Sequence, residues 1–205
     1  MDDLERFDCE QNSPEWYASR AGIPTASEFD TVMARGRGGG ESVGRRKYML
    51  RLIGERITGQ VVDGYTNAHM ERGHALEPEA RDLYALVKDA NVEQVGFLRR
   101  CGAGASPDSL VDTDGLLEIK TKVPHLQIEC LLSNQVPAEH LKQLHGQLWI
   151  SGRAWCDFVS YWPGLPLFVK RVERDEALIA RIAIEVREFL DEMAELEARV
   201  RAMTA

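Results

Sequence analysis

Closely spaced cysteines are absent from this chain of 205 residues. Its four cysteines, Cys9, Cys101, Cys130 and Cys156, are far apart in the sequence. Zinc and iron–sulfur sites are usually built from cysteine pairs such as C-x-x-C, so neither kind of site is expected. Free thiols in a reducing compartment are the expected state.

Long apolar runs are also missing. No stretch approaches the roughly 20 apolar residues of a membrane-spanning helix. The start, Met1-Asp-Asp-Leu-Glu-Arg, is acidic, whereas a secretory signal begins basic and continues apolar. We therefore expect a cytoplasmic protein that does not enter membranes. The composition, 44% hydrophobic and 28% charged, is ordinary for a globular protein, and the length of 205 residues predicts a single domain over residues 1–205. Apolar residues that recur at spacings of three and four predict that this domain ends in a helix over 174–205.

The chain has no excess of positive charge. Its formal net charge of −8 argues mildly against nucleic-acid binding, because phosphate contacts need Lys and Arg. Local clustering matters more than the total. Two basic clusters are present: one with Arg35, Arg37, Arg45, Arg46 and Lys47, and one with Lys120 and Lys122.

Residues 104–122 contain the most informative pattern. Ser106-Pro107-Asp108 precedes a turn signal, Asp112-Thr-Asp-Gly115, and then a strand-like run, Leu116 to Lys120. The simplest geometry is a hairpin that brings Asp108 near Glu118. Because side chains alternate along a strand, Glu118 and Lys120 are predicted to share one face.

This hairpin would place two carboxylates and one ammonium together. Carboxylate oxygens are the ligands that Mg²⁺ prefers, and a bound cation can neutralise charge that develops on a phosphate. Lys120 could orient the attacking water, or deprotonate it if burial lowers the pKa of the lysine. The alternative is a solvated surface strand, on which the same residue types are common.

The same residues carry a family resemblance. Pro107-Asp108 followed by Glu118-Ile119-Lys120 resembles the PD-(D/E)xK nuclease signature, and Gly104 to Asp108 is similar to the phage lambda exonuclease family, also called YqaJ-type viral recombinases. Four further stretches resemble that family in the same order: Trp16 to Glu28, Gly73-x-x-x-Glu77, Gln143 to Gln147, and Leu148-Trp-Ile150. The resemblance runs from about residue 16 to about residue 175 and implies a restriction-endonuclease-like α/β core, with a mixed central sheet flanked by helices.

The resemblance also implies an activity. Members of the family are Mg²⁺-dependent 5′→3′ exonucleases, with Mn²⁺ as a substitute, that digest one strand of linear double-stranded DNA. The 3′ overhang serves phage-type recombination by strand annealing. A homotrimer, a partner single-strand annealing protein and a location in the bacterial host cytoplasm are implied as well.

Roles for individual residues follow from the resemblance. It implies catalytic roles for Asp108, Glu118, Lys120, Glu77 and Gln143, and a metal held by Asp108, Glu118, Glu77 and the Ile119 carbonyl. It implies binding of the DNA 5′-phosphate by Arg20, Ser27 and Ser106. Further candidate DNA contacts are Met70 as a wedge, Arg35, Arg37, Arg45 and Gln147. One departure is that no arginine follows the Glu-x-Lys strand, and Lys122 or His125 is the candidate substitute.

Several of these residues have plainer interpretations. Arg20 could be a solvated helix residue, Met70 could pack in a core, and residues 35–44 could be a mobile linker. Thr25 to Glu28 fits a capping box. Glu77-Pro78 predicts a helix start, with Glu77 beside its dipole.

Two other functions are compatible with the residues. A restriction-type endonuclease would use the same Asp108, Glu118 and Lys120. A non-catalytic DNA-end-binding assembly protein would bind without cleaving, although it gains nothing from carboxylates placed near phosphate.

Overall fold

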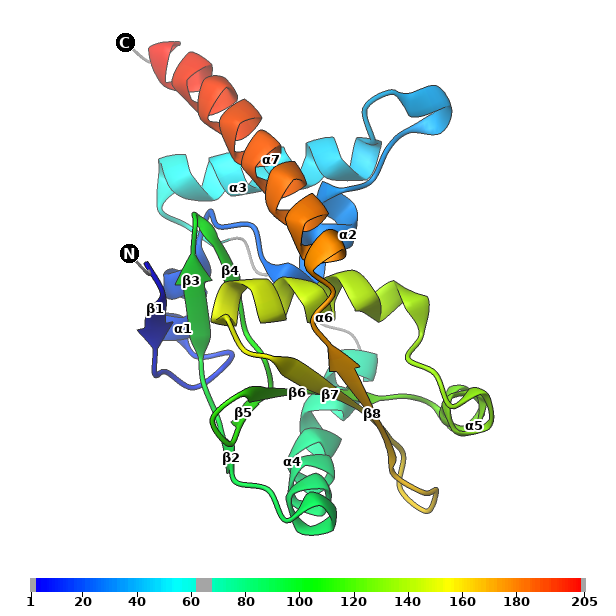
Figure 1. Cartoon of the computed structure of the whole chain (residues 1–205). Coiled ribbons are helices and arrows are strands. Elements are labelled where there is room, and N and C mark those ends of the chain that lie inside the picture. The colour runs from blue at the N-terminus through cyan, green and yellow to red at the C-terminus, as the bar shows by residue number, and fades with distance from the viewer. Residues whose placement is uncertain (1–2, 62–67, 204–205) are drawn as a thin grey trace.

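Two β-sheets lie at the centre of the molecule, with helices on both sides (Figure 1). The computed structural model describes residues 3–61 and 68–203, except the side chains of 68–71 and 74. The candidate wedge Met70 therefore lies outside the described side chains. The smaller sheet has the order β1-β3-β4, formed by Glu5–Phe7, Phe97–Arg100 and Ala103–Ala105.

The larger sheet is mixed, as predicted. Its order is β2-β5-β6-β7-β8, formed by Val92–Glu93, Ser109–Val111, Gly115–Thr121, Trp155–Tyr161 and Phe168–Glu173. Strands β6 and β7 pair in parallel, whereas the other neighbours pair antiparallel. The expected hairpin, β5–β6, is present, and β7 and β8 form a second antiparallel pair.

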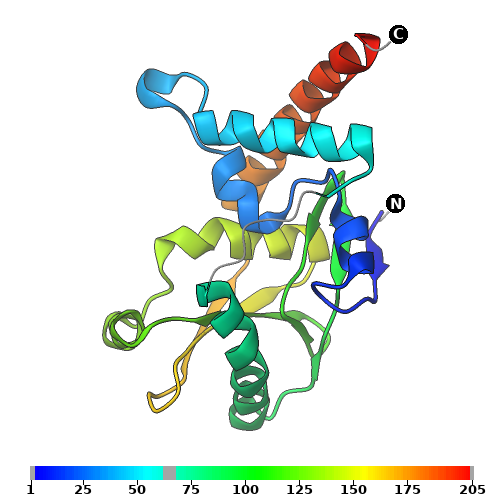
Figure 2. The ribbon, with the colours of Figure 1, turned by 180° about the vertical axis from the view of Figure 1, so that it is seen from behind.

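Helices cover the larger sheet from opposite sides (Figures 1 and 2). Helix α6 lies across one face, with α3 and α7 beyond it, and α4 lies against the other. The α-helices are α1 Pro14–Arg20, α2 Phe29–Val32, α3 Val43–Thr58, α4 Ala68–Lys88, α5 Pro124–Ser133, α6 Ala138–Ser151 and α7 Glu176–Ala202. Two 3₁₀ turns are η1 Ala26–Glu28 and η2 Arg37–Gly39. Within residues 3–61 and 68–203, every helix is too short or too polar to span a bilayer.

Strand β6 is buried on both faces, which fixes the direction of its side chains. Leu116 packs in a core that includes Leu144 and Leu148 of α6. Leu117 and Ile119 pack in a second core with Ala80 and Tyr84 of α4. Glu118 therefore points to the α6 side, as the alternation of the strand predicts.

Helix α4 runs unbroken through Pro78, so the predicted helix start at Glu77-Pro78 is wrong. Proline lacks one N–H, and the helix loses one backbone hydrogen bond there. Burial of Ala80 and Tyr84 against β6 favours continuation of the helix. Glu77 is consequently a mid-helix residue and does not sit at a helix N-terminus.

The capping box predicted at Thr25 to Glu28 is also wrong. Residues 26–28 form the 3₁₀ turn η1, and the Thr25 side chain makes no capping bond to it within the described structure. Thr25 Oγ1 instead lies 3.2 Å from Ser27 Oγ and 3.4 Å from Arg20 Nη2. The Thr25 hydroxyl thus contacts the polar side chains of Arg20 and Ser27 in place of the turn backbone.

Arg45 joins α3 to α7 and is buried, with 5% of its surface exposed. Its guanidinium donates to both Glu192 carboxylate oxygens, at 2.7 and 2.8 Å, and to the Val32 carbonyl at 3.0 Å. These three bonds give Arg45 a structural role inside the fold, and its DNA contact stays a prediction. Sequence clustering of charge could not reveal this burial.

Candidate active site

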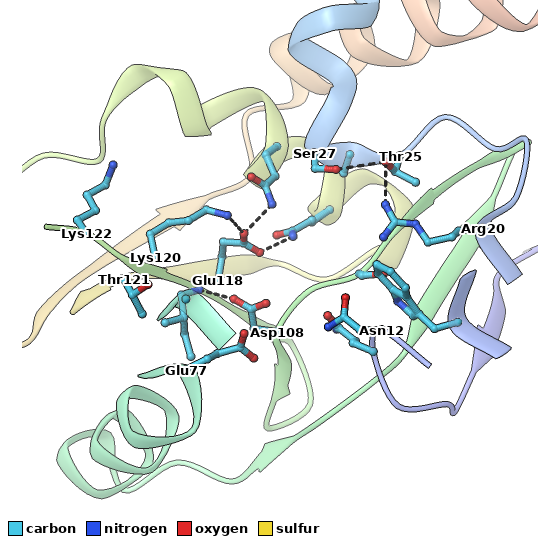
Figure 3. A pocket seen from close by; sticks show the side chains of 18 residues that line it. Asn12, Arg20, Thr25, Ser27, Glu77, Asp108, Glu118, Lys120, Thr121 and Lys122 are labelled. Carbon is cyan, nitrogen blue, oxygen red and sulfur yellow. Dashed lines mark hydrogen bonds and ion pairs between the residues drawn. The ribbon is translucent and has the colours of Figure 1, made fainter. Parts of the chain in front are cut away.

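A cavity of about 500 Å³ opens where the N-terminal segment, the β5–β6 hairpin and helices α4 and α6 meet (Figure 3). Its lining includes most of the residues singled out in the sequence: Arg20, Ser27, Glu77, Ser106, Asp108, Glu118, Ile119, Lys120, Lys122, Gln143 and Gln147. Segments far apart in the sequence thus contribute to one site.

The β5–β6 hairpin brings Asp108 to the middle of β6, as predicted. The Asp108 amide donates to the Leu117 carbonyl at 3.1 Å, and Asp108 Oδ2 accepts from the Ile119 amide at 2.5 Å. Asp108 and Glu118 therefore face the same cavity from neighbouring strands. The spacing of ten residues is what the intervening turn needs to fold the chain back.

Glu118 is 2% exposed and is held by three donors. Its Oε1 accepts from Lys120 Nζ and from Gln143 Nε2, each at 2.6 Å, and its Oε2 accepts from Gln147 Nε2 at 2.6 Å. Gln143 and Gln147 stand one turn apart on α6 and meet the same carboxylate, as their spacing predicts. Hydrogen bonds of this kind make a buried carboxylate tolerable.

Gln147 has an acceptor to spare. It is 1% exposed, and its Oε1 has no hydrogen-bond partner in the part of the chain that the structure describes. A buried polar atom without a partner is costly. Since Gln147 lines the cavity, this oxygen can accept a bond from a molecule inside it.

Glu77 reaches the cavity from α4. It forms an ion pair with Arg81, which also donates to Ser109 Oγ at 3.0 Å. This chain of contacts links α4 to the residue that follows Asp108. It holds Glu77 toward the carboxylate pair, where Figure 3 shows it below Asp108.

The carboxyl groups perturb one another. Burial raises the pKa of Asp108 well above its usual value, and the charges of Glu118 and Glu77 raise it further. Lys120 and the Ile119 amide oppose this effect. The negative charge of the cavity is thus concentrated around Asp108.

Lys120 keeps its proton. Burial alone lowers the pKa of Lys120, but Glu118 and Asp108 raise it by more, so the net direction is upward. The condition under which Lys120 would act as a base, a pKa lowered by burial, is therefore not met. Its protonated ammonium is suited to orienting water and phosphate oxygens.

The donor set suits a hard divalent cation. Asp108, Glu118, Glu77 and the Ile119 carbonyl offer oxygen ligands of the type that Mg²⁺ or Mn²⁺ takes, and the unbalanced negative charge at Asp108 favours a cation. Among the described residues, no group of three or more His, Cys, Asp or Glu side chains is already gathered as a metal cluster. The fit therefore rests on two close carboxylates, with other ligands left to water and substrate.

A second polar group lies at one end of the cavity. Arg20 lies 3.9 Å above the Trp16 ring and 3.4 Å from Thr25 Oγ1. Trp16 Nε1 donates to Ser106 Oγ at 3.0 Å. Burial lowers the pKa of the Arg20 guanidinium, which is the sign of a cation short of neighbouring charge. Arg20, Ser27 and Ser106 all line the cavity, as their predicted common role requires.

The two candidates for the missing arginine differ in place. His125 is exposed on α5 and is not part of the cavity lining, whereas Lys122 is. Figure 3, however, shows Lys122 at the end opposite Arg20, with Glu118 and Lys120 between them. Neither residue completes the polar group around Arg20.

The basic residues of the loop over 35–44 lie apart from this cavity lining. Arg35 pairs with Glu185 of α7 at 2.6 Å. Arg37 is exposed and makes no ion pair with any described residue. Their DNA contacts stay predictions.

Several lining residues were not expected from the sequence. Gln11 donates to the carbonyls of Val95 and Pro107, at 2.9 and 3.0 Å, and so supports the strand entry before Asp108. Asn12 lines the cavity with a positive φ of 69°. An asparagine next to a turn is too common a signal to identify such a position.

Gly146 lets α6 press against η1. A Cβ atom at this position would lie 2.5 Å from Phe29 Cδ2 and 3.2 Å from the Ala26 side chain. Gly146 sits between Gln143 and Gln147, and Ala26 sits beside Ser27. The glycine therefore sets the distance between the carboxylate end and the Arg20 end of the cavity.

Comparisons with known proteins agree with this geometry. A family model, the YqaJ-like viral recombinase domain, matches residues 15–154. An alkaline exonuclease from Laribacter hongkongensis, LHK-Exo, is 39% identical over 94% of this chain and 98% of its own, with a TM-score of 0.84. The structure of LHK-Exo in complex with dAMP gives a TM-score of 0.85 at the same identity and coverage.

A more distant structure shares the fold alone. A phage related exonuclease from Haemophilus somnus 129PT is 12% identical, with a TM-score of 0.66 over 87% of this chain and 96% of its own. No curated protein sequence matches. The PD-(D/E)xK fold predicted from Asp108 to Lys120 is confirmed by LHK-Exo.

Proposed function

Because the chain belongs to the YqaJ-like viral recombinase family and is a DNA exonuclease, we propose that it digests one strand of linear double-stranded DNA from the 5′ end. The family implies a divalent metal cation, and Mg²⁺ is the proposed ion. The product is a duplex with a 3′ single-stranded overhang. Residues 1–205 act as one catalytic domain in this proposal.

The observation that carries the proposal is the two-ended cavity. Two carboxylates and Lys120 lie in its middle, and Arg20 and Ser27 lie at one end (Figure 3). Ser106 belongs to the same end, because Trp16 bonds its hydroxyl and stacks under Arg20. An arginine beside hydroxyl groups suits a terminal phosphate, which presents more negative charge than an internal one. The scissile phosphate then lies at Asp108 and Glu118, one nucleotide inside the DNA end.

The side chains divide the chemistry. A bound divalent cation supplies charge neutralisation at the phosphate. Asp108, Glu118, Glu77 and the Ile119 carbonyl provide its oxygen ligands. The Lys120 ammonium orients the attacking water and stabilises the charge of the transition state. Gln143 and Gln147 fix Glu118, and the vacant acceptor of Gln147 orients a water or a nucleotide donor.

End-labelled DNA tests the proposal. Duplexes labelled separately at the 5′ and 3′ ends are digested with Mg²⁺ and with EDTA, beside a covalently closed circle. We expect mononucleotide release from the 5′ label, dependence on Mg²⁺ and an intact circle. Release from the 3′ label would overturn the polarity, and cutting of the circle would indicate an endonuclease.

Assembly belongs to the proposal as well. A viral recombinase that makes 3′ overhangs needs a protein that anneals them, so a single-strand annealing protein is the proposed partner. A homotrimer is the proposed form, since a ring around DNA would retain the substrate between cycles. Sedimentation with and without DNA tests it, and a monomer under both conditions would contradict it.

A further inference from the structure

Lys122 is the one lining cation of the described structure with no place in the scheme above. It follows the end of β6 and lies at the end of the cavity opposite Arg20 (Figure 3). Lys120 and Glu118 precede it along the chain, so the three residues follow the strand direction in order. Asp108 and Glu118 therefore lie between two separate cationic ends.

Lys122 is buried without a strong ionic partner. Its side chain is 12% exposed, and its ammonium lies 3.4 Å from Glu139, whose own side chain is 69% exposed. A charge that is mostly removed from water is costly unless it is well paired. A distant carboxylate in solvent compensates it weakly, because water screens such pairs.

His140 holds the ammonium in place. Its Nε2 lies 3.0 Å from Lys122 Nζ, and its ring stacks on Phe158 with centroids 5.2 Å apart. Burial, with Lys122 and Lys120 nearby, lowers the pKa of His140 to about 4. The ring is thus neutral at neutral pH and accepts the hydrogen bond from Lys122.

We propose that Lys122 binds a phosphate of the cleaved strand on the 3′ side of the scissile linkage, and that His140 positions it. This inference rests on the proposed function, which places the terminal phosphate at Arg20 and the scissile phosphate at Asp108 and Glu118. Continuing along the same strand leads to Lys122. A phosphate at this position would compensate the charge of the Lys122 ammonium, which the exposed Glu139 carboxylate compensates only weakly.

The test removes the lysine charge and the phosphate charge separately. Release of the first nucleotide is measured in single turnover, at several duplex concentrations, for the wild type and for Lys122→Gln. The control is Lys142→Gln, which removes the same charge from α6 at a residue that pairs with Asp30 in solvent. We expect Lys122→Gln to raise the half-saturating DNA concentration about tenfold, as for loss of a charge-assisted hydrogen bond, and the control to change it little.

Neutral methylphosphonates at the first and second linkages 3′ to the scissile one locate the contact. For the wild type, the half-saturating concentration of one of these two duplexes should be about tenfold higher than that of the unmodified duplex. For Lys122→Gln, the same modification should raise the half-saturating concentration no further. The salt dependence of binding should weaken in Lys122→Gln by roughly one phosphate contact. Equal losses in both proteins, or equal behaviour of Lys122→Gln and Lys142→Gln, would overturn the inference.

The role of His140 has its own readout. His140→Ala should raise the half-saturating concentration with little change in the maximal rate. His140→Gln, which keeps an acceptor, should restore much of the difference, and neither change should add to Lys122→Gln. A fall in the maximal rate that glutamine does not rescue would mean that His140 only supports the fold.

Failure of this inference and failure of the proposed function are distinguishable. If the polarity is wrong, the wild type releases nucleotides from the 3′ label whatever residue stands at 122. If only the phosphate contact is wrong, the wild type digests from the 5′ end and Lys122→Gln does the same at unchanged DNA concentration.

Discussion

Two regions of the molecule arrange their charged side chains differently: one brings opposite charges into contact, and the other gathers like charges. Where α3 meets α7, Arg45 binds Glu192 through two bonds, and Arg35 binds Glu185. In the cavity, Asp108, Glu118 and Glu77 crowd together, and the pKa of Asp108 is raised by burial and by the other two. The first region pairs opposite charges inside the fold, whereas the second gathers like charges around Asp108.

The difference shows where stability and activity are separable. Ion pairs that join α7 to α3 and to the loop before it stabilise the fold. Like charges that are gathered in a cavity cost stability and are typical of binding and catalytic sites. The comparison therefore predicts opposite consequences for substitutions in the two regions.

The largest expected effect follows Lys120→Ala in the cavity. Loss of a positioned ammonium should lower the rate of nucleotide release by about 10²–10⁴-fold, while DNA binding changes little. Quenched-flow release and fluorescence anisotropy measure the two quantities. Wild-type-like cleavage would remove Lys120 from the mechanism.

Arg20→Ala should act on the choice of DNA end. The wild type should prefer 5′-phosphorylated over 5′-hydroxyl duplexes. In the variant, the ratio of the two activities should fall about tenfold, as for loss of one charge-assisted hydrogen bond. The ratio of kcat/KM on the two duplexes measures it. An unchanged ratio would place the terminal phosphate elsewhere.

Arg45→Ala probes the α3–α7 region. It removes the bonds to Glu192 and Val32 and should lower the free energy of unfolding by about 1–3 kcal/mol, because Glu192 is half exposed and can be hydrated. The specific rate of the folded enzyme should stay unchanged. Arg35→Ala is the matched control and should cost less than about 1 kcal/mol, since its pair is exposed. A loss of activity at unchanged stability would return Arg45 to the DNA-binding residues.

Asp108→Asn should have a small effect on stability, and it should be stabilising. The folded chain binds the Asp108 proton more tightly than the unfolded chain does. Proton binding at Asp108 therefore stabilises the fold fully when the pH is below the ordinary carboxyl pKa. This stabilisation is lost as the pH rises through the raised pKa of Asp108 in the folded chain. In EDTA, the variant should therefore exceed the wild type in Tm by an amount that grows with pH over that window. At neutral pH the variant should have the higher Tm of the two proteins.

The exposed residue Asp82 of α4 gives the control for this experiment. Asp82→Asn should leave the Tm unchanged at every pH. Mg²⁺ should reduce the gap between Asp108→Asn and the wild type, because the ion binds the native carboxylates. A gap that shrinks as the pH rises would contradict the raised pKa.

Local patterns in the sequence predicted the central hairpin well. The turn from Asp112 to Gly115 and the alternation around Glu118 depend on neighbours along the chain, and both appear as expected. Helical spacing predicts that Gln143 and Gln147 face the same way, and both donate to Glu118. These features need little information from distant parts of the fold.

Features decided by distant packing could not be predicted in this way. Helix α4 continues through Pro78 because β6 covers its apolar side. Thr25 loses its capping role because Ser27 and Arg20 face its hydroxyl. The assignment of Arg45 depended on Glu192, which lies 147 residues away.

Gly146 carries a consequence for the size of each cut. The side chains of Phe29 and Ala26 leave no room for a side chain there, so α6 packs closely against η1 between the Arg20 end and the paired carboxylates. Under the proposed function, this spacing separates the terminal phosphate at Arg20 from the scissile phosphate at Asp108 and Glu118 by one nucleotide. A bulkier residue at 146 would increase the distance between these two phosphate positions. The products would then be irregular fragments in place of uniform mononucleotides.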